Sequence, residues 1–228
     1  GTGNSLWIGT QRGHLIKHDG ATFTTVQKFN TIVRKVFIDK QGLIWVALEG
    51  DGLYCLNETG EKILHHYAAG NEDGDHLFQN NAFDIEQLND SVIICAAGAM
   101  NFIYKKTGKV KWLTVEDGLP GNTLMRIRRD HMGYMWMITA NGLCRYNPVN
   151  HRITPYGRKD AVTVARITRE ADYLSADNHL MFAGGANLLV FKGGTDEIDN
   201  RPPDVLITDF KLFNRYLPVD SLLEQPYM

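Results

Sequence analysis

The 228-residue sequence lacks the features that mark several classes of protein. No apolar run approaches the roughly 20 residues that a transmembrane helix needs, and the opening GTGNSLW has no secretory signal pattern. The 24 Lys and Arg residues nearly balance the 26 Asp and Glu residues and form no basic stripe. Nucleic-acid binding therefore has no electrostatic footprint, and we expect neither a nucleic-acid partner nor direct membrane contact for this chain.

Cysteine is scarce. An odd count of three, with wide spacing between Cys55, Cys95 and Cys144, argues against a disulfide framework or a zinc site. All three lie in apolar strand contexts, where a free cysteine behaves as a small hydrophobic side chain. We therefore expect free, buried thiols.

Metal-binding patterns are weak as well. The polar loop 68–76 carries Asn71, Asp73 and Asp75, but it lacks the glutamate and the preceding helix of a calcium-binding EF-hand. His65 and His66 are adjacent on a predicted strand and so point to opposite faces, which makes a metal site with His76 improbable. The sequence predicts no metal and no other cofactor.

Short strands separated by turn residues dominate what is present. In the stretch 118–146, the segments 122–129, 134–139 and 143–146 are strand candidates, and the turns between them are rich in Asp, Asn and Gly. The middle segment, YMWMIT, does not alternate between apolar and polar residues. Such a strand is buried on both faces, as in the middle of stacked sheets.

The same frame recurs along the chain. It is centred on five apolar residues at intervals of 38, 49, 42 and 45 residues, namely Trp7, Trp45, Ile94, Trp136 and Met181. Two positions further stand Gly9, Ala47, Ala96, Ile138 and Ala183, of which all but Ile138 are small. A repeat of about 40–50 residues made of short strands is typical of a β-propeller, with one blade per period.

We therefore predict an all-β fold with about five propeller blades. The blades lie near 1–29, 30–67, 77–115, 118–156 and 157–195, and 161–169 is the expected inner strand of the fifth. The first blade lacks the inner strand that should precede Leu6, so we expect the chain to be a piece of a longer protein. A linker at 196–204 leads to 205–228, the expected truncated start of a second β domain.

One repeat carries a family resemblance. The stretch GLPGNTLMRIRRDHMGYMWMITANGLCRYNP resembles the two-component regulator propeller repeat, whose pattern is GLP-x-N-x-V, a strand, D-x-x-G-x-LW-I-G-T and NGL-x-R-Y-x-P. The matching residues are Gly118, Leu119, Pro120, Asn122, Asp130, Gly133, Trp136, Thr139, Asn141, Gly142 and Leu143. The segment VLITDFKLFNRYLPVD is similar to the start of the triple-tyrosine immunoglobulin-like domain that follows such propellers.

The resemblance implies a location and a role. Proteins of this kind are mostly hybrid two-component sensors of gut Bacteroidetes, whose periplasmic propellers precede a membrane helix and a histidine kinase. They typically detect breakdown products of polysaccharides. The resemblance therefore implies a periplasmic, non-enzymatic, ligand-sensing fragment whose parent is a kinase and whose ligand is an oligosaccharide. Two alternatives stay open: a structural or protein-interaction propeller with sensing elsewhere in the parent, and a propeller polysaccharide lyase.

Polar loop residues are the candidates for ligand binding. In a propeller, the loop before each inner strand and the loop after each central strand emerge on the same face. Amide, guanidinium and carboxylate groups on that face suit sugar hydroxyls, although the same residues also form ordinary turns. The candidate ligand-binding residues are Arg12, Glu49, Asp51, Asn81, Asn122, Asn141 and Asn187, and no catalytic residue stands out.

The resemblance also implies a ring of seven blades, of which this chain supplies about five. Residues such as Leu6, Trp7, Phe182 and Leu189 are expected to line two uncovered blade faces. Exposed apolar area promotes association. We therefore expect the isolated fragment either to self-associate or to tighten into a smaller, strained ring, in addition to contact with the rest of the sensor chain or within a dimer of the parent.

Overall fold

The computed structural model describes residues 5–70, 75–157, 171–184, 187–194, 210–212 and 215–217. The chain divides into two units, Gly1–Thr195 and Asp196–Met228. The described residues of the second unit form one hairpin, β19 (Phe210–Leu212) with β20 (Arg215–Leu217). The described part of the chain contains no α-helix, and no helix in it is long and apolar enough to cross a membrane.

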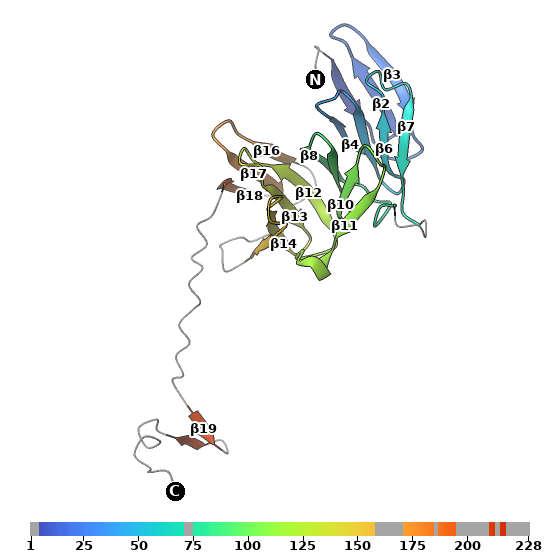
Figure 1. The fold of residues 1–228 in the computed structure, drawn as a ribbon. Coiled ribbons are helices and arrows are strands. Elements are labelled where there is room, and N and C mark those ends of the chain that lie inside the picture. Colours follow the sequence, from blue (N-terminus) through green and yellow to red (C-terminus); the bar gives the residue numbers. More distant parts are fainter. Residues whose placement is uncertain are drawn as a thin grey trace. The chain divides into compact units, whose positions relative to one another are not determined.

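The first unit consists of five antiparallel sheets in chain order, here called blades 1 to 5 (Figure 1). Blade 1 holds β1 (Leu6–Gly9), β2 (His14–His18) and β3 (Phe23–Lys28). Blade 2 holds β4 (Val33–Ile38), β5 (Ile44–Leu48), β6 (Gly52–Leu56) and β7 (Ile63–Tyr67). Blade 3 holds β8 (Asp84–Asn89), β9 (Val92–Ala97), β10 (Ala99–Tyr104) and β11 (Val110–Leu113). Blade 4 holds β12 (Leu124–Arg129), β13 (Met135–Thr139), β14 (Gly142–Tyr146) and β15 (Ile153–Tyr156). Blade 5 holds β16 (Ala171–Leu174), β17 (His179–Gly184) and β18 (Asn187–Lys192).

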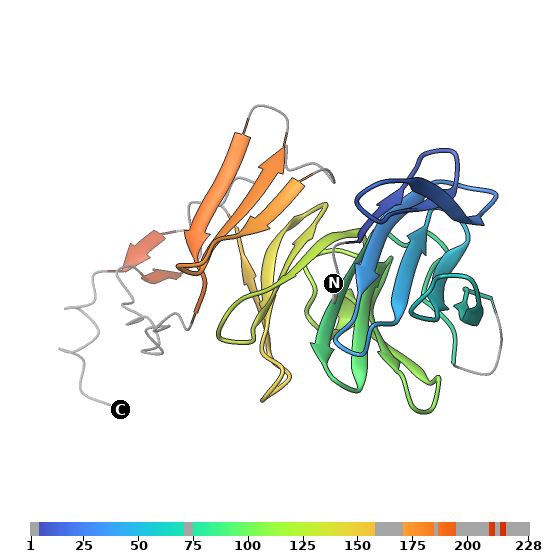
Figure 2. The ribbon, with the colours of Figure 1, turned by 90° about the horizontal axis from the view of Figure 1, so that it is seen from above.

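The blades follow one another in an open arc. Successive inner strands β4, β8, β12 and β16 lie side by side, and blade 1 meets β4 through β1. Figure 2 shows blades 1 and 5 at opposite ends of this arc. The predicted all-β propeller fold is confirmed.

Two local expectations differ from the structure. Residues 161–169 lie outside the described residues, and the strand that pairs with β17 is β16, at Ala171–Leu174. In the blade predicted near 77–115, the outer strand ends at Leu113, two residues short of the predicted limit, because Thr114 caps a 3-10 turn at Val115–Asp117. The Asp117 carboxylate accepts a hydrogen bond from the Thr114 N–H at 2.8 Å, which diverts the backbone from the sheet. The limits of the linker and of the second domain stay predictions.

Every residue of the central strands β5, β9 and β13 is buried, as their unbroken apolar runs predict. Apolar clusters fill the spaces between neighbouring blades. Small residues permit this close stacking. A Cβ on Gly9 would lie 2.3 Å from Cγ1 of Val33, so a larger residue there would push β1 away from β4.

Asp39 and Trp45 form a unit that joins three parts of blade 2. Oδ1 of Asp39 accepts hydrogen bonds from the N–H groups of Gln41 and Leu43, both at 3.0 Å, and so holds the β4–β5 turn. Oδ2 accepts from the indole Nε1 of Trp45 at 3.1 Å. It also lies 3.0 Å from Nζ of Lys105, which reaches over from blade 3.

Asp130 and Trp136 form the same unit in blade 4. Oδ1 of Asp130 accepts from the N–H groups of Met132 and Tyr134, and Oδ2 accepts from Nε1 of Trp136, all at 2.9 Å. Oδ2 of Asp130 also accepts a hydrogen bond from the N–H of Gly194 in blade 5, at 3.0 Å. Each unit, here called an Asp–Trp unit, therefore fastens a tight turn to its own blade and to the next.

Trp45 and Trp136 are 1% and 2% exposed, which confirms their predicted burial. Trp7 occupies the equivalent register position, since it pairs with Lys17 as Trp136 pairs with Arg145. It is only half buried, and Nζ of Lys17 lies 5.6 Å from its ring centroid. Trp7 is thus placed as predicted but less well covered.

Charged side chains of the four inner strands form a network that the sequence analysis did not find. Its members are Lys35 of β4, Asp84 and Glu86 of β8, Arg126 and Arg128 of β12, and Asp172 of β16. Asp84 is fully buried, and its Oδ1 lies 2.8 Å from Nζ of Lys35. Its Oδ2 accepts from the N–H of Ile127 at 3.0 Å. One carboxylate therefore links blades 2, 3 and 4, and we call this set the inner-strand network.

The Asp–Trp unit leads to a prediction about stability. Trp136→Ala should lower the free energy of unfolding by about 3–5 kcal/mol, because a buried indole is lost and Asp130 loses a donor. Trp7→Ala should cost clearly less, because Trp7 is only partly buried and has no aspartate partner among the described residues. Urea denaturation of both variants measures the difference. Equal losses would contradict the assignment of Trp136 to a blade-joining unit.

The inner-strand network leads to a second prediction. Asp84→Ala should lower the free energy of unfolding by about 3 kcal/mol, because it leaves Lys35 and the Ile127 N–H without their buried acceptor. Asp90→Ala is the control, since Asp90 is exposed and lies 3.9 Å from exposed Lys40. The control should change stability by less than about 0.5 kcal/mol. If the two variants melt alike, the network does not link the blades.

Candidate ligand-binding site

The loops predicted to share one face do meet in the structure. In blade 4, the Ala140 N–H after the central strand donates to the carbonyl of Thr123, before the inner strand, at 3.1 Å. In blade 2, the Glu49 N–H donates to the carbonyl of Ile32 at 3.1 Å. These backbone bonds bring together the loops that carry most of the candidate residues. We call this surface the loop face.

Two acidic candidates of the loop face already have protein partners. Glu49 is paired with Arg34 on β4. Oδ2 of Asp51 accepts a hydrogen bond from the Tyr54 hydroxyl at 3.0 Å, and Oδ1 lies 3.5 Å from Nε2 of His66. Burial, together with the Asp51 carboxylate, raises the pKa of Tyr54 to about 12, so this phenol stays a hydrogen-bond donor at neutral pH.

Two amide candidates hold their own loops. Oδ1 of Asn122 accepts from the N–H of Val115 at 3.1 Å, and Nδ2 of Asn141 donates to the carbonyl of Pro120 at 3.1 Å. Arg12 and Asn81 are exposed, and Asn187 is the first residue of β18, paired with Gly184. The structure therefore brings the candidates to one side without gathering them into one cavity.

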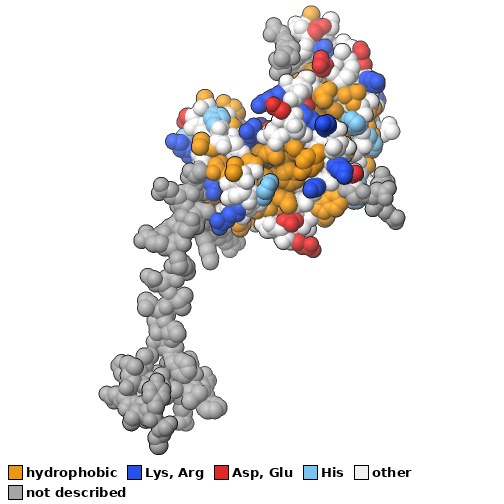
Figure 3. Space-filling model, in the orientation of Figure 1, with side chains coloured by type: hydrophobic (Ala, Val, Ile, Leu, Met, Phe, Trp, Pro, Cys, Tyr) orange, Lys and Arg blue, Asp and Glu red, His pale blue; other side chains and the backbone are white. Residues whose placement is uncertain are grey.

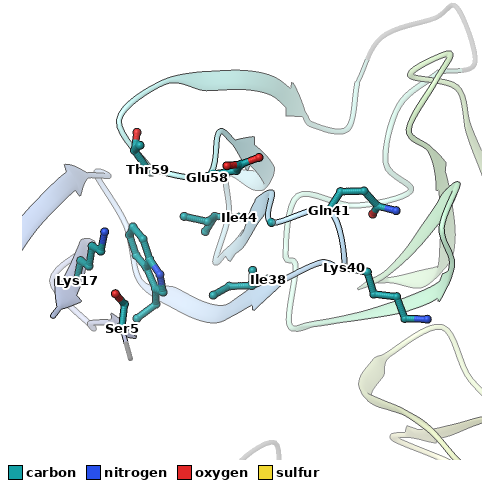
Figure 4. A pocket seen from close by; sticks show the side chains of 10 residues that line it. Ser5, Lys17, Ile38, Lys40, Gln41, Ile44, Glu58 and Thr59 are labelled. Carbon is teal, nitrogen blue, oxygen red and sulfur yellow. The ribbon is translucent and has the colours of Figure 1, made fainter. Parts of the chain in front are cut away.

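Two cavities open at the opposite ends of the strands, near the turns between inner and central strands. The first lies between blades 1 and 2 and has a volume of about 360 Å³. Figure 4 shows Ser5 and Lys17 on one side of it, Ile38 and Ile44 in the middle, and Gln41 and Lys40 on the other side, with Glu58 and Thr59 above. Trp7 also lines it. None of the seven candidate residues does.

The second cavity lies between blades 3 and 4 and has a volume of about 500 Å³. Blade 3 contributes Phe102, Tyr104 and Lys111, and blade 4 contributes Tyr146 and His151. The seven candidates are again not among its lining residues. The sequence carries one signal for it, because Ile94 interrupts the series of central tryptophans.

Buried thiols and one buried carboxyl group have raised pKa values in the described residues. Cys55, Cys95 and Cys144 are free and buried, as predicted. Burial raises the pKa of the Cys55 and Cys144 thiols to about 12 and that of Cys95 further still, so they stay protonated. Burial also raises the pKa of Glu86, against the lowering effect of the Gln87 N–H and Arg128. In the described ranges, no group of three or more His, Cys, Asp or Glu residues is placed to hold a metal ion.

Comparison with known proteins supports the resemblance found in the repeats. No protein-family model matches the chain. Histidine kinase P4 of Formosa agariphila is 24% identical over 229 residues, covering 94% of this chain and 16% of the kinase. The chain therefore spans about a sixth of that relative.

Solved structures give the same picture for the fold. The extracellular domain of the putative hybrid two-component system BT3049 from B. thetaiotaomicron has a TM-score of 0.65 at 19% identity, covering 84% of this chain and 26% of that one. The extracellular domain of the putative hybrid two-component system BT4673 from the same organism has a TM-score of 0.67 at 15% identity, covering 82% and 28%.

The resemblance predicted from the repeats is thereby confirmed. The chain is a propeller arc with the fold of the extracellular domains of hybrid two-component systems, and its sequence is similar to part of a histidine kinase.

Proposed function

We propose that this chain is a ligand-sensing part of the periplasmic region of a hybrid two-component sensor kinase. The observation that carries the proposal is its similarity, along 94% of its length, to a histidine kinase. The fold shared with extracellular domains of such systems supports an extracytoplasmic location. The chain itself is not an enzyme in this proposal, and the kinase activity belongs to the parent.

The proposed ligand is an oligosaccharide released from a polysaccharide. Support comes from the chemistry of the surface. The loop face presents the exposed guanidinium of Arg12 and the exposed amide of Asn81, and both cavities combine aromatic rings with polar side chains. Rings and a few convergent polar groups are the usual lining of sites for small polar ligands.

Two other functions give different expectations. A structural or protein-interaction propeller would bind no saccharide. It is supported by apolar residues exposed on the outer face of blade 5, where Tyr173 is 60% and Val190 46% exposed. A polysaccharide lyase would consume its ligand by acid–base elimination, for which the hydrogen-bonded Tyr146 hydroxyl and His151 Nδ1, 2.6 Å apart, are the nearest candidates at a cavity.

An oligosaccharide panel separates the three functions. Calorimetric titration of the complete extracellular region with oligosaccharides should give at least one ligand that is bound and recovered unchanged. Binding without turnover supports the sensor. No binding across the panel would favour the structural propeller, and accumulation of unsaturated products would favour the lyase.

A substitution on the loop face tests whether that face takes part. In the intact sensor, Arg12→Ala, Asp51→Ala and Asn141→Ala should each weaken the response to the ligand. Stability should change least in Arg12→Ala, because its side chain is exposed, and by less than about 0.5 kcal/mol. Arg152→Ala, at an exposed arginine between β14 and β15, is the control. A normal response with a lowered melting temperature would assign these residues to turn structure.

The outer faces of the end blades are the proposed association surfaces. Of the four residues expected from the sequence, Leu6 is exposed, whereas Trp7, Phe182 and Leu189 pack against the neighbouring blade. Phe182 is fully buried against blade 4, and Trp7 packs against blade 2, because side chains alternate along each strand. Leu6 and Phe23 at one end, and Tyr173 and Val190 at the other, are the exposed ones.

We expect the 228-residue chain to self-associate through these faces. Light scattering should show a mean mass that rises with protein concentration, because exposed apolar surface favours association. The double variant Tyr173→Lys/Val190→Lys should shift the mass toward the monomer. Val149→Lys, at a loop residue that is 89% exposed, should leave it unchanged. If the unsubstituted 228-residue chain stays monomeric at high concentration, this expectation is wrong.

A further inference from the structure

The Asp–Trp unit is interrupted in blade 3. Ile94 pairs with Phe102 across β9 and β10, in the position where Trp45 pairs with Cys55 and Trp136 pairs with Arg145. An isoleucine side chain is smaller than that of tryptophan and has no N–H group to donate to a carboxylate. The carboxylate of the unit is replaced as well, since the turn after β8 is held by Asn89, whose Oδ1 accepts from the Ser91 N–H at 2.9 Å.

The cavity between blades 3 and 4 lies at this interruption. Its lining includes Asn89 from the turn, Phe102 opposite Ile94, and Tyr146 from the facing blade. The interfaces between blades 2 and 3 and between blades 4 and 5 hold an indole and its aspartate at the equivalent strand positions. Lys105 of blade 3 or Gly194 of blade 5 contacts that aspartate. The 500 Å³ space therefore lies next to the altered unit, where Phe102, the cross-strand partner of Ile94, forms part of its lining.

The chemistry of the lining is specific. The floor is apolar and aromatic, because Val92, Phe102 and Tyr146 are buried there. The rim is polar, with half-exposed Tyr104 and exposed Asn89, Lys111 and His151. Figure 3 shows apolar side chains gathered in the middle of the visible face, over the region of β10 and β12. Among the described residues that line this cavity, none is Asp or Glu.

These features select a ligand class. The apolar face of a sugar ring suits the aromatic floor, and ring hydroxyls suit the amide and phenol groups of the rim. Lys111 carries a fixed positive charge that no lining carboxylate offsets. An anionic group on the sugar is therefore favoured over a neutral one.

We propose that the cavity between blades 3 and 4 binds a uronate residue, with its carboxylate at Lys111 and its ring against Phe102 and Tyr104. This site rests on the proposed function, because it adds to the loop face a second subsite and gives the chemical class of the saccharide residue bound there. It lies at the opposite ends of the strands from the loop face. A volume of about 500 Å³ lies within the range of about 300–1,000 Å³ that is usual for small-molecule sites.

Binding of monosaccharides to the 228-residue chain tests the proposal. Glucuronate and galacturonate should bind more tightly than glucose, and Lys111→Gln should weaken uronate binding about fivefold, as expected for a partly solvated ion pair. Lys109→Gln is the matched control, because Lys109 is an exposed lysine that does not line the cavity. It should leave uronate affinity unchanged.

A second variant tests the cavity without removing charge. Ile94→Trp restores the residue of blades 2 and 4 beside Phe102 and should weaken uronate binding by displacing Phe102 into the space. Tyr104→Leu, at a half-exposed position, is measured alongside in case the larger side chain prevents folding, and it should lower affinity at least fivefold. Uronate binding that survives both Lys111→Gln and Tyr104→Leu would overturn the site.

The remaining outcomes separate this site from the proposed function. If the complete extracellular region binds an oligosaccharide but the 228-residue chain binds no uronate, the cavity proposal fails and the sensor proposal stands. Stronger binding of glucose than of glucuronate, or binding of benzoate in place of both, overturns the uronate assignment. If neither the chain nor the complete region binds any saccharide, both proposals fail.

Discussion

The arrangement of the blades depends on an aspartate carboxylate that is shared between a turn, an indole and the neighbouring blade. In blades 2 and 4, one oxygen of Asp39 or Asp130 holds the turn, and the other accepts from the tryptophan and from the next blade. A buried carboxylate is stable only when its lone pairs are satisfied. The local turn, the burial of the indole and the stacking of the blades must therefore form together.

Electrostatics along the inner strands adds a second set of connections between blades. Glu86 and Asp84 of β8 accept hydrogen bonds from backbone N–H groups of β12, at Arg129 and Ile127. Arg126 and Arg128 of β12 then reach Asp172 of β16. Carboxylates and guanidinium groups thus alternate from one blade to the next, so that each buried charge lies near one of opposite sign.

The repeats differ in whether they contain a complete Asp–Trp unit, and this difference decides which blade interfaces are filled. Where the Asp–Trp unit is complete, it joins two blades through Lys105 or Gly194, and the space between them is filled. Where Ile94 replaces the tryptophan, a cavity with a polar rim remains. A repeat protein can accept such a change because each blade contacts only its neighbours, so the loss at one interface leaves the others intact.

The sequence alone determined the blades, because apolar runs such as Met135–Thr139 and the Asp-x-x-Gly turn before them act locally and recur at a regular period. It also determined the burial of Trp45, Trp136 and the three cysteines. The tertiary structure decided which side chains meet. The partners of Asp84 come from other blades, residues 35 and 127, and the cavity at Ile94 needs Tyr146 of the facing blade. Such contacts join positions about one repeat apart, and a local pattern carries no information on how two blade faces fit.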